Sequence, residues 1–187
     1  WSFKDHGKSW GAIYEREHAP GFRWLHESFG TNWRMTEIQG VLGRIQLKRM
    51  DDWRSTRQAN AKAIWKTASR LPGLRVPQVP QDVEHAAYKC YVFVESGKLA
   101  EGWSRDRIIN AIVEAGVPCF SGSCSEVYLE KAFDNTGWRP EVPLSVAREL
   151  GETSLMFLVH PTLTADEIEK TCRVLTSVME QAVNDHV

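Results

Sequence analysis

The feature that most constrains this chain is a long amphipathic segment between Thr36 and the helix-breaking pair Pro72-Gly73. Residues Thr36 to Gln39 have the pattern of a capping box, in which a hydroxyl and a side-chain amide satisfy backbone N–H groups that the first turn of a helix leaves free. Apolar residues then recur at helical spacing: Ile38, Val41, Leu42, Ile45, Met50, Trp53, Ile64, Trp65, Ala68 and Leu71. The pattern predicts one long helix over residues 36–71, straight or bent.

Three later segments have the aromatic and β-branched content that is typical of strands, at residues 88–94, 117–120 and 154–159. A shorter segment of the same kind, residues 22–26, lies within a stretch rich in glycine, histidine and aromatic residues. We therefore predict one short strand there, inside an otherwise irregular lead-in over residues 1–35.

Capping residues predict the remaining helices. Ser104 precedes a helix that Gly116 closes, and residues 164–167 form a second capping box. Shorter helices are predicted near residues 126–133 and over residues 143–151. Together, the predicted strands and helices indicate an α+β fold of three short strands packed with helices. Its first helix is longer than so small a sheet needs, so we expect this helix to pack as well on something outside the chain.

Composition excludes several classes of function. The chain has 187 residues and a formal net charge of −1, which gives it no basic field for a nucleic acid. No apolar run approaches the roughly 20 residues of a membrane-spanning helix, so we expect a cytoplasmic protein without a membrane partner. The four cysteines form no C-x-x-C pair, which predicts reduced thiols and no metal site. The common nucleotide-binding and hydrolase motifs are also missing from the sequence.

Two clusters of polar residues are candidate anion sites. Residues 30–35 stand just before the capped helix start, where free N–H groups together with Asn32 and Arg34 would hold a phosphate; alternatively these two side chains only fix the turn. Residues 121–125, with Ser121 and Ser123, offer hydroxyls before the next helix or form an ordinary turn.

Two further side chains are candidate reactive groups. Cys124 would need a histidine partner to act as a nucleophile, and no spacing in the chain supports such a pair. His160 ends a predicted strand before Pro161, so it either faces a cleft or caps a turn.

Several motifs, taken in order, resemble the DegT/DnrJ/EryC1/StrS family of sugar aminotransferases. The most specific is G-T-N-W-R-M-T-E-I-Q over residues 30–39, followed by Gly43 and Q-L-K-R-M over residues 46–50. The other matching stretches are residues 2–8, the turn at 71–74, and V-H-P at 159–161 with T-A-D-E at 164–167. The resemblance covers essentially the whole chain and is strongest to members from lipopolysaccharide and O-antigen pathways.

This resemblance implies the smaller, C-terminal domain of a fold-type-I aminotransferase that uses pyridoxal 5'-phosphate (PLP). Residues 1–35 would be a lead-in from the large PLP domain, and residues 36–187 would be the small domain. None of the nine lysines lies in a loop like the one that carries the cofactor in the family. We therefore expect the Schiff-base lysine upstream of Trp1, and residues 1–187 to be inactive by themselves.

The resemblance also assigns roles to particular residues. Asn32 matches the asparagine that reaches the PLP phosphate of the neighbouring subunit, and Arg34 matches the next motif position, with a cofactor-binding or structural role. His160 matches the family's H-P dipeptide, where substrate-side and structural roles are both open. Many relatives have H-Y-x-P-L-H where this chain has residues 120–128. The substituted stretch leaves Ser121 and Ser123 as candidate substrate contacts and leaves the identity of the sugar open.

The leading hypothesis is a homodimeric enzyme with shared active sites that transfers an amino group, from L-glutamate, to a nucleotide-linked keto sugar. Two alternatives stay open at this stage. Some relatives carry histidine in place of the lysine and dehydrate a deoxysugar instead, and a chain of this length is also compatible with a non-catalytic dimerisation module.

Overall fold

The computed structural model describes residues 6–17, 23–30 and 35–183. The chain divides into two compact units. One comprises residues 1–43 and 123–151, and the other comprises residues 44–122 and 152–187. The boundary predicted at residue 35 separates the large PLP domain from the small domain of a whole enzyme. It stays a prediction.

The larger unit is built on a four-stranded antiparallel sheet of order β1-β2-β4-β3. Its strands are β1 (Leu74–Arg75), β2 (Cys90–Val94), β3 (Cys119–Phe120) and β4 (Ser154–Phe157). The three predicted strands are all present, each shorter than its sequence pattern. Two residues are too few to show a periodicity, which explains why β1 was not predicted.

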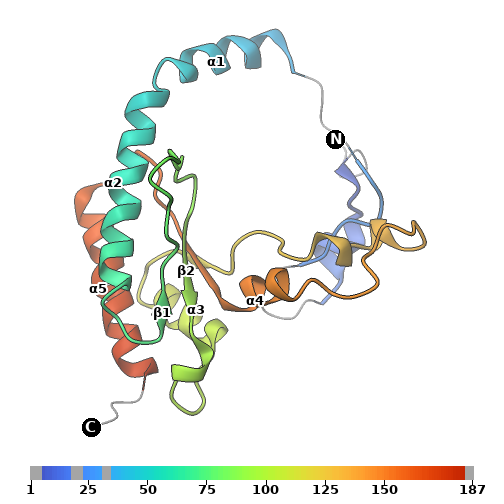
Figure 1. Ribbon diagram of the computed structural model, residues 1–187. Helices are drawn as coiled ribbons and strands as arrows, with labels where there is room; N and C mark the ends of the chain where they lie inside the picture. Colours follow the sequence, from blue (N-terminus) through green and yellow to red (C-terminus); the bar gives the residue numbers. More distant parts are fainter. Residues whose placement is uncertain (1–5, 18–22, 31–34, 184–187) are drawn as a thin grey trace. The chain divides into compact units, whose positions relative to one another are not determined.

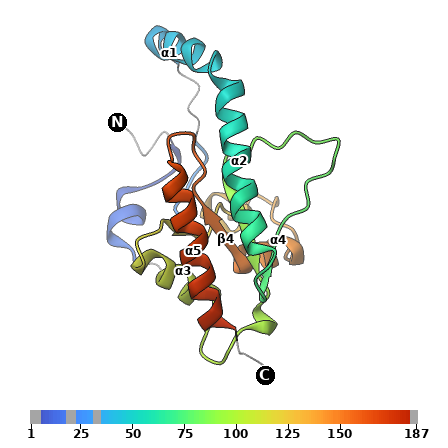
Figure 2. The same cartoon turned by 90° about the vertical axis from the view of Figure 1, so that its left-hand side faces the viewer.

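Three helices cover one face of this sheet: α2 (Met50–Ala68), α3 (Arg105–Glu114) and α5 (Ala165–Ala182). Helices α2 and α5 lie side by side in both views (Figures 1 and 2). The hydrophobic core lies between them and the sheet, and its largest fully buried side chains include Phe157, Ile64 and Ile108. Together with the sheet, this layer confirms the predicted α+β class.

Strand register sorts the side chains of the sheet onto two faces. Cys90 and Cys119 both stand opposite Phe157, and all three are buried in the core. The other face presents the alternate positions, where Tyr91 and Phe120 both stand opposite Met156. This second face, away from α2, α3 and α5, carries the turn at Gly122, which packs against the ring of Tyr91.

The predicted long helix is divided into α1 (Glu37–Leu47) and α2 by a turn at Lys48-Arg49. The prediction of one helix is therefore wrong at this point. The apolar spacing explains the break, because Ile45 and Met50 are five residues apart and fall out of phase with a 3.6-residue repeat. The N–H of Arg49 bonds to the carbonyl of Gln46, which tightens the end of α1.

The predicted caps are confirmed by their hydrogen bonds. The N–H of Thr36 donates to Gln39 Oε1 at 2.8 Å, and the N–H of Gln39 donates to Thr36 Oγ1 at 3.3 Å. Ser104 Oγ accepts from the N–H of Arg107, and Thr164 with Glu167 forms the second capping box. Each of these helix starts is thus set by local chemistry that the sequence displays.

The smaller unit has little regular structure. Its elements are residues 37–43 of α1, a π-helical turn η2 (Gly11–Glu15), the 3₁₀ turns η4 (Val127–Leu129) and η5 (Lys131–Phe133), and residues 145–151 of α4 (Ser145–Thr153). The predicted helix near 126–133 is therefore two 3₁₀ turns. The predicted strand at 22–26 is wrong for its described residues, because 23–25 are irregular and His26 forms only an isolated bridge with Lys8; Phe22 lies outside the described residues.

No helix within residues 6–17, 23–30 and 35–183 is long and apolar enough to cross a membrane.

Candidate functional site

The two predicted cofactor contacts, Asn32 and Arg34, lie outside the described residues. The capped start of α1 follows them directly, and a helix start attracts anions through its free N–H groups and its dipole. Their assignment to the PLP phosphate stays a prediction.

Ser121 lies at the end of β3 with its backbone held by the sheet. Ser154 Oγ, in a residue that is 5% exposed, donates a hydrogen bond of 2.7 Å to the carbonyl of Ser121. Gly122 follows with φ of +94°, packed against the ring of Tyr91. The turn after β3 is therefore fixed on the sheet face away from the helices.

The close approach at Gly122 gives a direct test of this turn. A Cβ at this position would lie 2.6 Å from Tyr91 Cε1, in a backbone conformation that L side chains rarely adopt. We expect Gly122→Ala to lower the free energy of unfolding by about 1–3 kcal/mol, measured by urea denaturation. Gly97→Ala is the matched control because a Cβ there meets nothing within 4 Å. Equal stability of the two variants would contradict this geometry.

His160 lies in the turn between β4 and α5. Its Nδ1 is 2.8 Å from Thr162 Oγ1, and its carbonyl accepts a hydrogen bond from the N–H of Leu163. The preceding residue, Val159, is buried, and its carbonyl accepts from Asn60 Nδ2 at 3.4 Å. Within the described residues, Nε2 of His160 has no protein partner. The ring is thus oriented through Nδ1, and Nε2 remains available for a ligand.

The predicted substrate contacts do not meet at one point. Ser121 is tied to Ser154, at one end of β4, while His160 follows the other end. Six residue steps of extended chain span at most about 20 Å. Ser123 begins the second segment of the smaller unit, where it is exposed. Ser121 and His160 are therefore associated with opposite ends of β4.

Cys90, Cys119 and Cys124 are not activated as nucleophiles. Burial raises the pKa of the Cys124 thiol to about 11, and the nearby Glu130 carboxylate acts in the same direction. Burial raises the pKa of Cys90 and of Cys119 to about 12. Because the thiolate is the nucleophilic form, all three stay protonated and unreactive near neutral pH.

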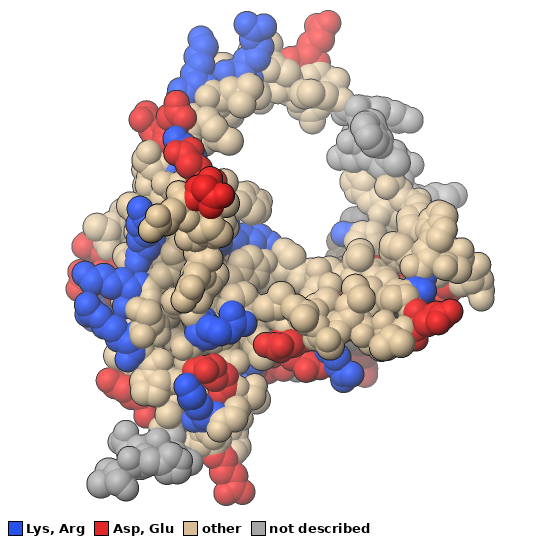
Figure 3. All heavy atoms as spheres, in the orientation of Figure 1, with Lys and Arg blue, Asp and Glu red and all other residues tan. Residues whose placement is uncertain are grey.

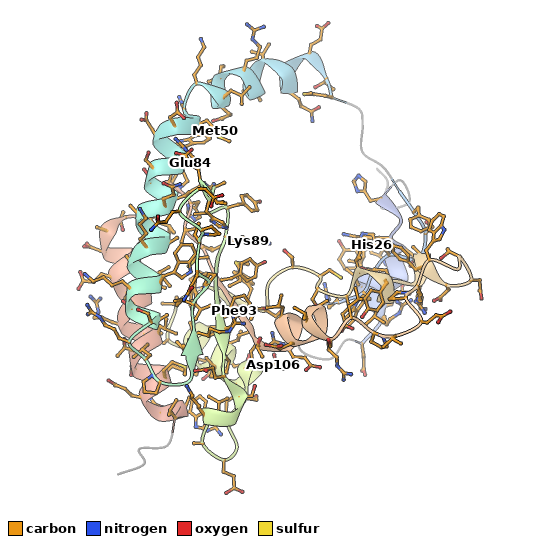
Figure 4. The ribbon with its side chains drawn as sticks, in the orientation of Figure 1. His26, Met50, Glu84, Lys89, Phe93 and Asp106 are labelled. Atoms are coloured by element: carbon orange, nitrogen blue, oxygen red, sulfur yellow. The ribbon has the colours of Figure 1, made fainter. Side chains whose placement is uncertain are left out.

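The buried carboxylate of Glu130 connects two segments of the smaller unit. The sequence alone did not predict this contact. Glu130 is 3% exposed, and its carboxylate accepts from the N–H of His26 at 2.8 Å and lies 2.9 Å from His26 Nδ1. Figure 4 labels His26. The N–H of Ala132 donates in turn to the carbonyl of His26. The pairing joins segments about 100 residues apart, so no local sequence signal marks it.

The burial of each described lysine shows whether its surroundings resemble those of a lysine that carries PLP. In the described part of the chain no lysine is buried, and most are exposed. Lys98 pairs with Glu95 at 2.8 Å, and Lys170 donates to the carbonyl of Gly116 at 2.9 Å. A lysine that carries PLP is desolvated within its site. The described residues therefore contain no desolvated lysine of this kind. They also contain no group of three or more His, Cys, Asp or Glu that would hold a metal ion.

Several known proteins are similar to this chain. An aminotransferase structure from Psychrobacter cryohalolentis is 61% identical, with a TM-score of 0.73 over 95% of this chain and 47% of that one. The dTDP-3-amino-3,4,6-trideoxy-alpha-D-glucose transaminase of Streptomyces venezuelae is 26% identical over 86% of this chain and 42% of its own length. The spore coat polysaccharide biosynthesis protein SpsC of Bacillus subtilis is 26% identical over 95% of this chain and 45% of its own length.

The chain thus spans less than half the length of these relatives. Its neighbours have the fold-type-I aminotransferase architecture, of which it is a part. Residues 3–176 match the DegT/DnrJ/EryC1/StrS aminotransferase family. The chain therefore belongs to this family, whose members are PLP-dependent aminotransferases.

Proposed function

We propose that the full-length protein containing this chain transfers an amino group from L-glutamate to the keto group of a nucleotide-linked sugar. The observation that carries this proposal is the family match over residues 3–176. A dTDP-amino-sugar transaminase and a polysaccharide biosynthesis protein among its relatives support a sugar as the acceptor. We assign the enzyme to the cytoplasm and to lipopolysaccharide or O-antigen biosynthesis, on the resemblance of its motifs to members from those pathways.

Two residues near the start of α1 are proposed to hold the cofactor. PLP, when bound, supplies the electron sink for the nitrogen transfer. Asn32 donates a hydrogen bond to the phosphate of PLP, and Arg34 adds positive charge beside it. The lysine that carries the cofactor is expected outside residues 1–187, which by themselves are expected to be inactive. Ser121, Ser123 and His160 are proposed contacts of the substrate.

A second copy of the protein is the proposed partner of α1, as part of a homodimer with shared active sites. None of the eleven residues of α1 is buried. Ile38, Val41 and Ile45 are 74%, 58% and 44% exposed and stand three and four residues apart, on one side of the helix. So continuous an apolar stripe is typical of a contact surface. Asn32, which is proposed to reach the neighbouring subunit's cofactor, stands five residues before the start of α1 in the sequence.

The amino donor is tested without any sugar. The purified full-length protein loaded with PLP is mixed with L-glutamate, and 2-oxoglutarate is measured. An aminotransferase is expected to release about one equivalent per site in this half-reaction. A dehydratase that carries histidine in place of the lysine, or a non-catalytic module, would release none. Amino donors other than glutamate, tried in the same way, distinguish a wrong donor from a wrong reaction.

Asn32 is tested by its effect on cofactor affinity. Asn32→Ala is expected to weaken PLP binding at least tenfold, because a hydrogen bond to a charged phosphate contributes about 1.5–3 kcal/mol. Equilibrium dialysis of the full-length dimer measures the dissociation constant. Asn110→Ala, at an exposed position of α3, is the matched control. A PLP affinity of Asn32→Ala equal to that of the control would remove Asn32 from the cofactor site.

A further inference from the structure

Ser154, at the start of β4, is a buried polar residue. It is 5% exposed, and in the described part of the chain only Glu130, in the smaller unit, is also both polar and buried. A buried hydroxyl costs free energy unless it forms a hydrogen bond, whereas an alanine side chain would fill most of the same space at no such cost. A role for Ser154 is therefore expected in the bond that its hydroxyl forms.

The hydroxyl of Ser154 continues the contact between β3 and β4 beyond the end of their ladder. The ladder ends where Phe120 stands opposite Met156. Strand β4 extends further, to Ser154, which pairs with β2. There, Ser154 Oγ donates at 2.7 Å to the carbonyl of Ser121, the first residue after β3. A side chain thus holds the residue at which the turn begins.

The backbone of Ser154 is itself held on two sides. Within the sheet, Ser154 stands opposite Phe93 of β2. From α3, Arg105 Nη1 donates to the carbonyl of Ser154 at 3.1 Å, while Arg105 Nε pairs with Asp106 at 2.8 Å. Figure 3 shows many charged side chains of the larger unit on its surface, but that of Arg105 is only 11% exposed. The hydroxyl of Ser154 is therefore carried by a fixed backbone.

Ser121 has a fixed carbonyl and an available hydroxyl. The next residue, Gly122, packs against the ring of Tyr91, so the turn is restrained from its other side as well. Among the residues that the structure describes, Ser121 Oγ has no hydrogen-bond partner. A hydroxyl on a restrained backbone loses little conformational freedom when it binds a ligand.

We propose that Ser154 is a positioning residue for the nucleotide-linked substrate and acts by fixing the backbone of Ser121. This inference rests on the proposed function, which supplies the substrate and makes Ser121 one of its contacts. Ser154 itself does not touch the substrate. Its hydrogen bond orders the start of the turn before the substrate arrives, and this order lowers KM for the substrate. Without the bond, substrate binding has to order the turn as well.

The test compares the two half-reactions of the full-length, PLP-loaded protein. The acceptors are dTDP- and UDP-linked 4-keto-6-deoxyhexoses, and the donor is L-glutamate. Ser154→Ala is expected to raise KM for the acceptor about fivefold, the size of one neutral hydrogen bond, with kcat within about twofold of the parent. Release of 2-oxoglutarate from glutamate alone is expected to stay within about twofold of the parent too, because glutamate has no sugar or nucleotide to meet Ser121.

A rescue experiment separates the hydroxyl from the packing. Threonine and valine have nearly the same shape, and only threonine carries a hydroxyl. Ser154→Thr is therefore expected to have a KM about fivefold lower than that of Ser154→Val, because both variants bear the same added bulk. Thr176→Val is the matched control, since Thr176 Oγ1 also donates to a backbone carbonyl, that of Cys172 within α5. Its KM is expected to equal that of the parent.

Hydrogen exchange follows the turn in the absence of any substrate. In Ser154→Ala the N–H groups of residues 121–123 are expected to exchange about tenfold faster than in the parent, because the turn opens more often. Exchange in α3 is expected to be unchanged. Equal exchange of residues 121–123 in the two proteins would mean that packing at Gly122 is enough to fix the turn, and it would overturn the proposal.

Failure of this inference differs from failure of the proposed function. If Ser154→Ala keeps the KM of the parent, or if its release of 2-oxoglutarate falls as much as its turnover of the acceptor, Ser154 is only structural and the proposed function stands. If the parent releases 2-oxoglutarate but aminates none of these acceptors, the nucleotide-linked substrate is wrong, and the role of Ser154 falls with it.

Discussion

Phe157→Ala is expected to lower the free energy of unfolding by about 3–5 kcal/mol, because it removes a large side chain from a closely packed core. Phe157 has no exposed surface, lies on the central strand β4, and stands opposite Cys90 on one neighbouring strand and Cys119 on the other. A cavity at this point removes contacts within the core between the sheet and its covering helices. Urea denaturation followed by circular dichroism measures the effect.

Phe120→Ala is the control for this experiment. Phe120 is also a phenylalanine of the sheet, but its side chain is 47% exposed and belongs to the other face. The same truncation is expected to cost only about 1 kcal/mol there, since half of its surface is already in water. Similar losses in the two variants would mean that the core does not lie between the helices and the sheet.

Glu130→Ala is expected to cost about 2–3 kcal/mol, because hydrogen bonds to a charged group contribute about 1.5–3 kcal/mol and their loss leaves buried donors unpaired. Glu130 is 3% exposed and engages both the N–H and the ring of His26. The loss is expected in the smaller unit, so tryptophan fluorescence of Trp24, whose Nε1 donates to the carbonyl of Glu126, is a suitable probe. Ser28, which bonds to the carbonyl of Gly7, reports the same unit by hydrogen exchange.

Glu169→Ala provides the contrast for the Glu130 variant. Glu169 pairs with Arg173 on the surface of α5, where the two side chains are 68% and 63% exposed. An exposed pair spaced by four residues contributes about 0.3–0.5 kcal/mol, so this change is expected to be nearly silent. If Glu130→Ala is equally silent, the buried pair does not hold the smaller unit together.

Local chemistry made much of the larger unit predictable. Thr36, Ser104 and Thr164 each accept from the backbone N–H group three residues later, as their patterns indicate. A cap is a contact between neighbours in sequence, and so it can be recognised without the fold. The break between α1 and α2 is also encoded locally, in the five-residue step from Ile45 to Met50, although the pattern on either side favoured one helix.

The remaining features could not be predicted, because they depend on contacts between residues far apart in the sequence. The anchor between His26 and Glu130 joins segments about 100 residues apart, and β1 has too few residues for a pattern. The strand predicted over residues 88–94 begins only at Cys90, after Ala87 with its positive φ and the exposed Tyr88.

Following the transferred nitrogen atom tests the proposed reaction most directly. The full-length enzyme with PLP is incubated with ¹⁵N-labelled L-glutamate and a nucleotide-linked keto sugar, and the sugar product is analysed by mass spectrometry and ¹⁵N NMR. The proposal predicts a product in which the keto oxygen is replaced by a ¹⁵N amino group, formed in equal amount with 2-oxoglutarate. A product that has lost water and carries no ¹⁵N, or a protein that leaves every keto sugar tested unchanged while PLP is bound, would contradict it.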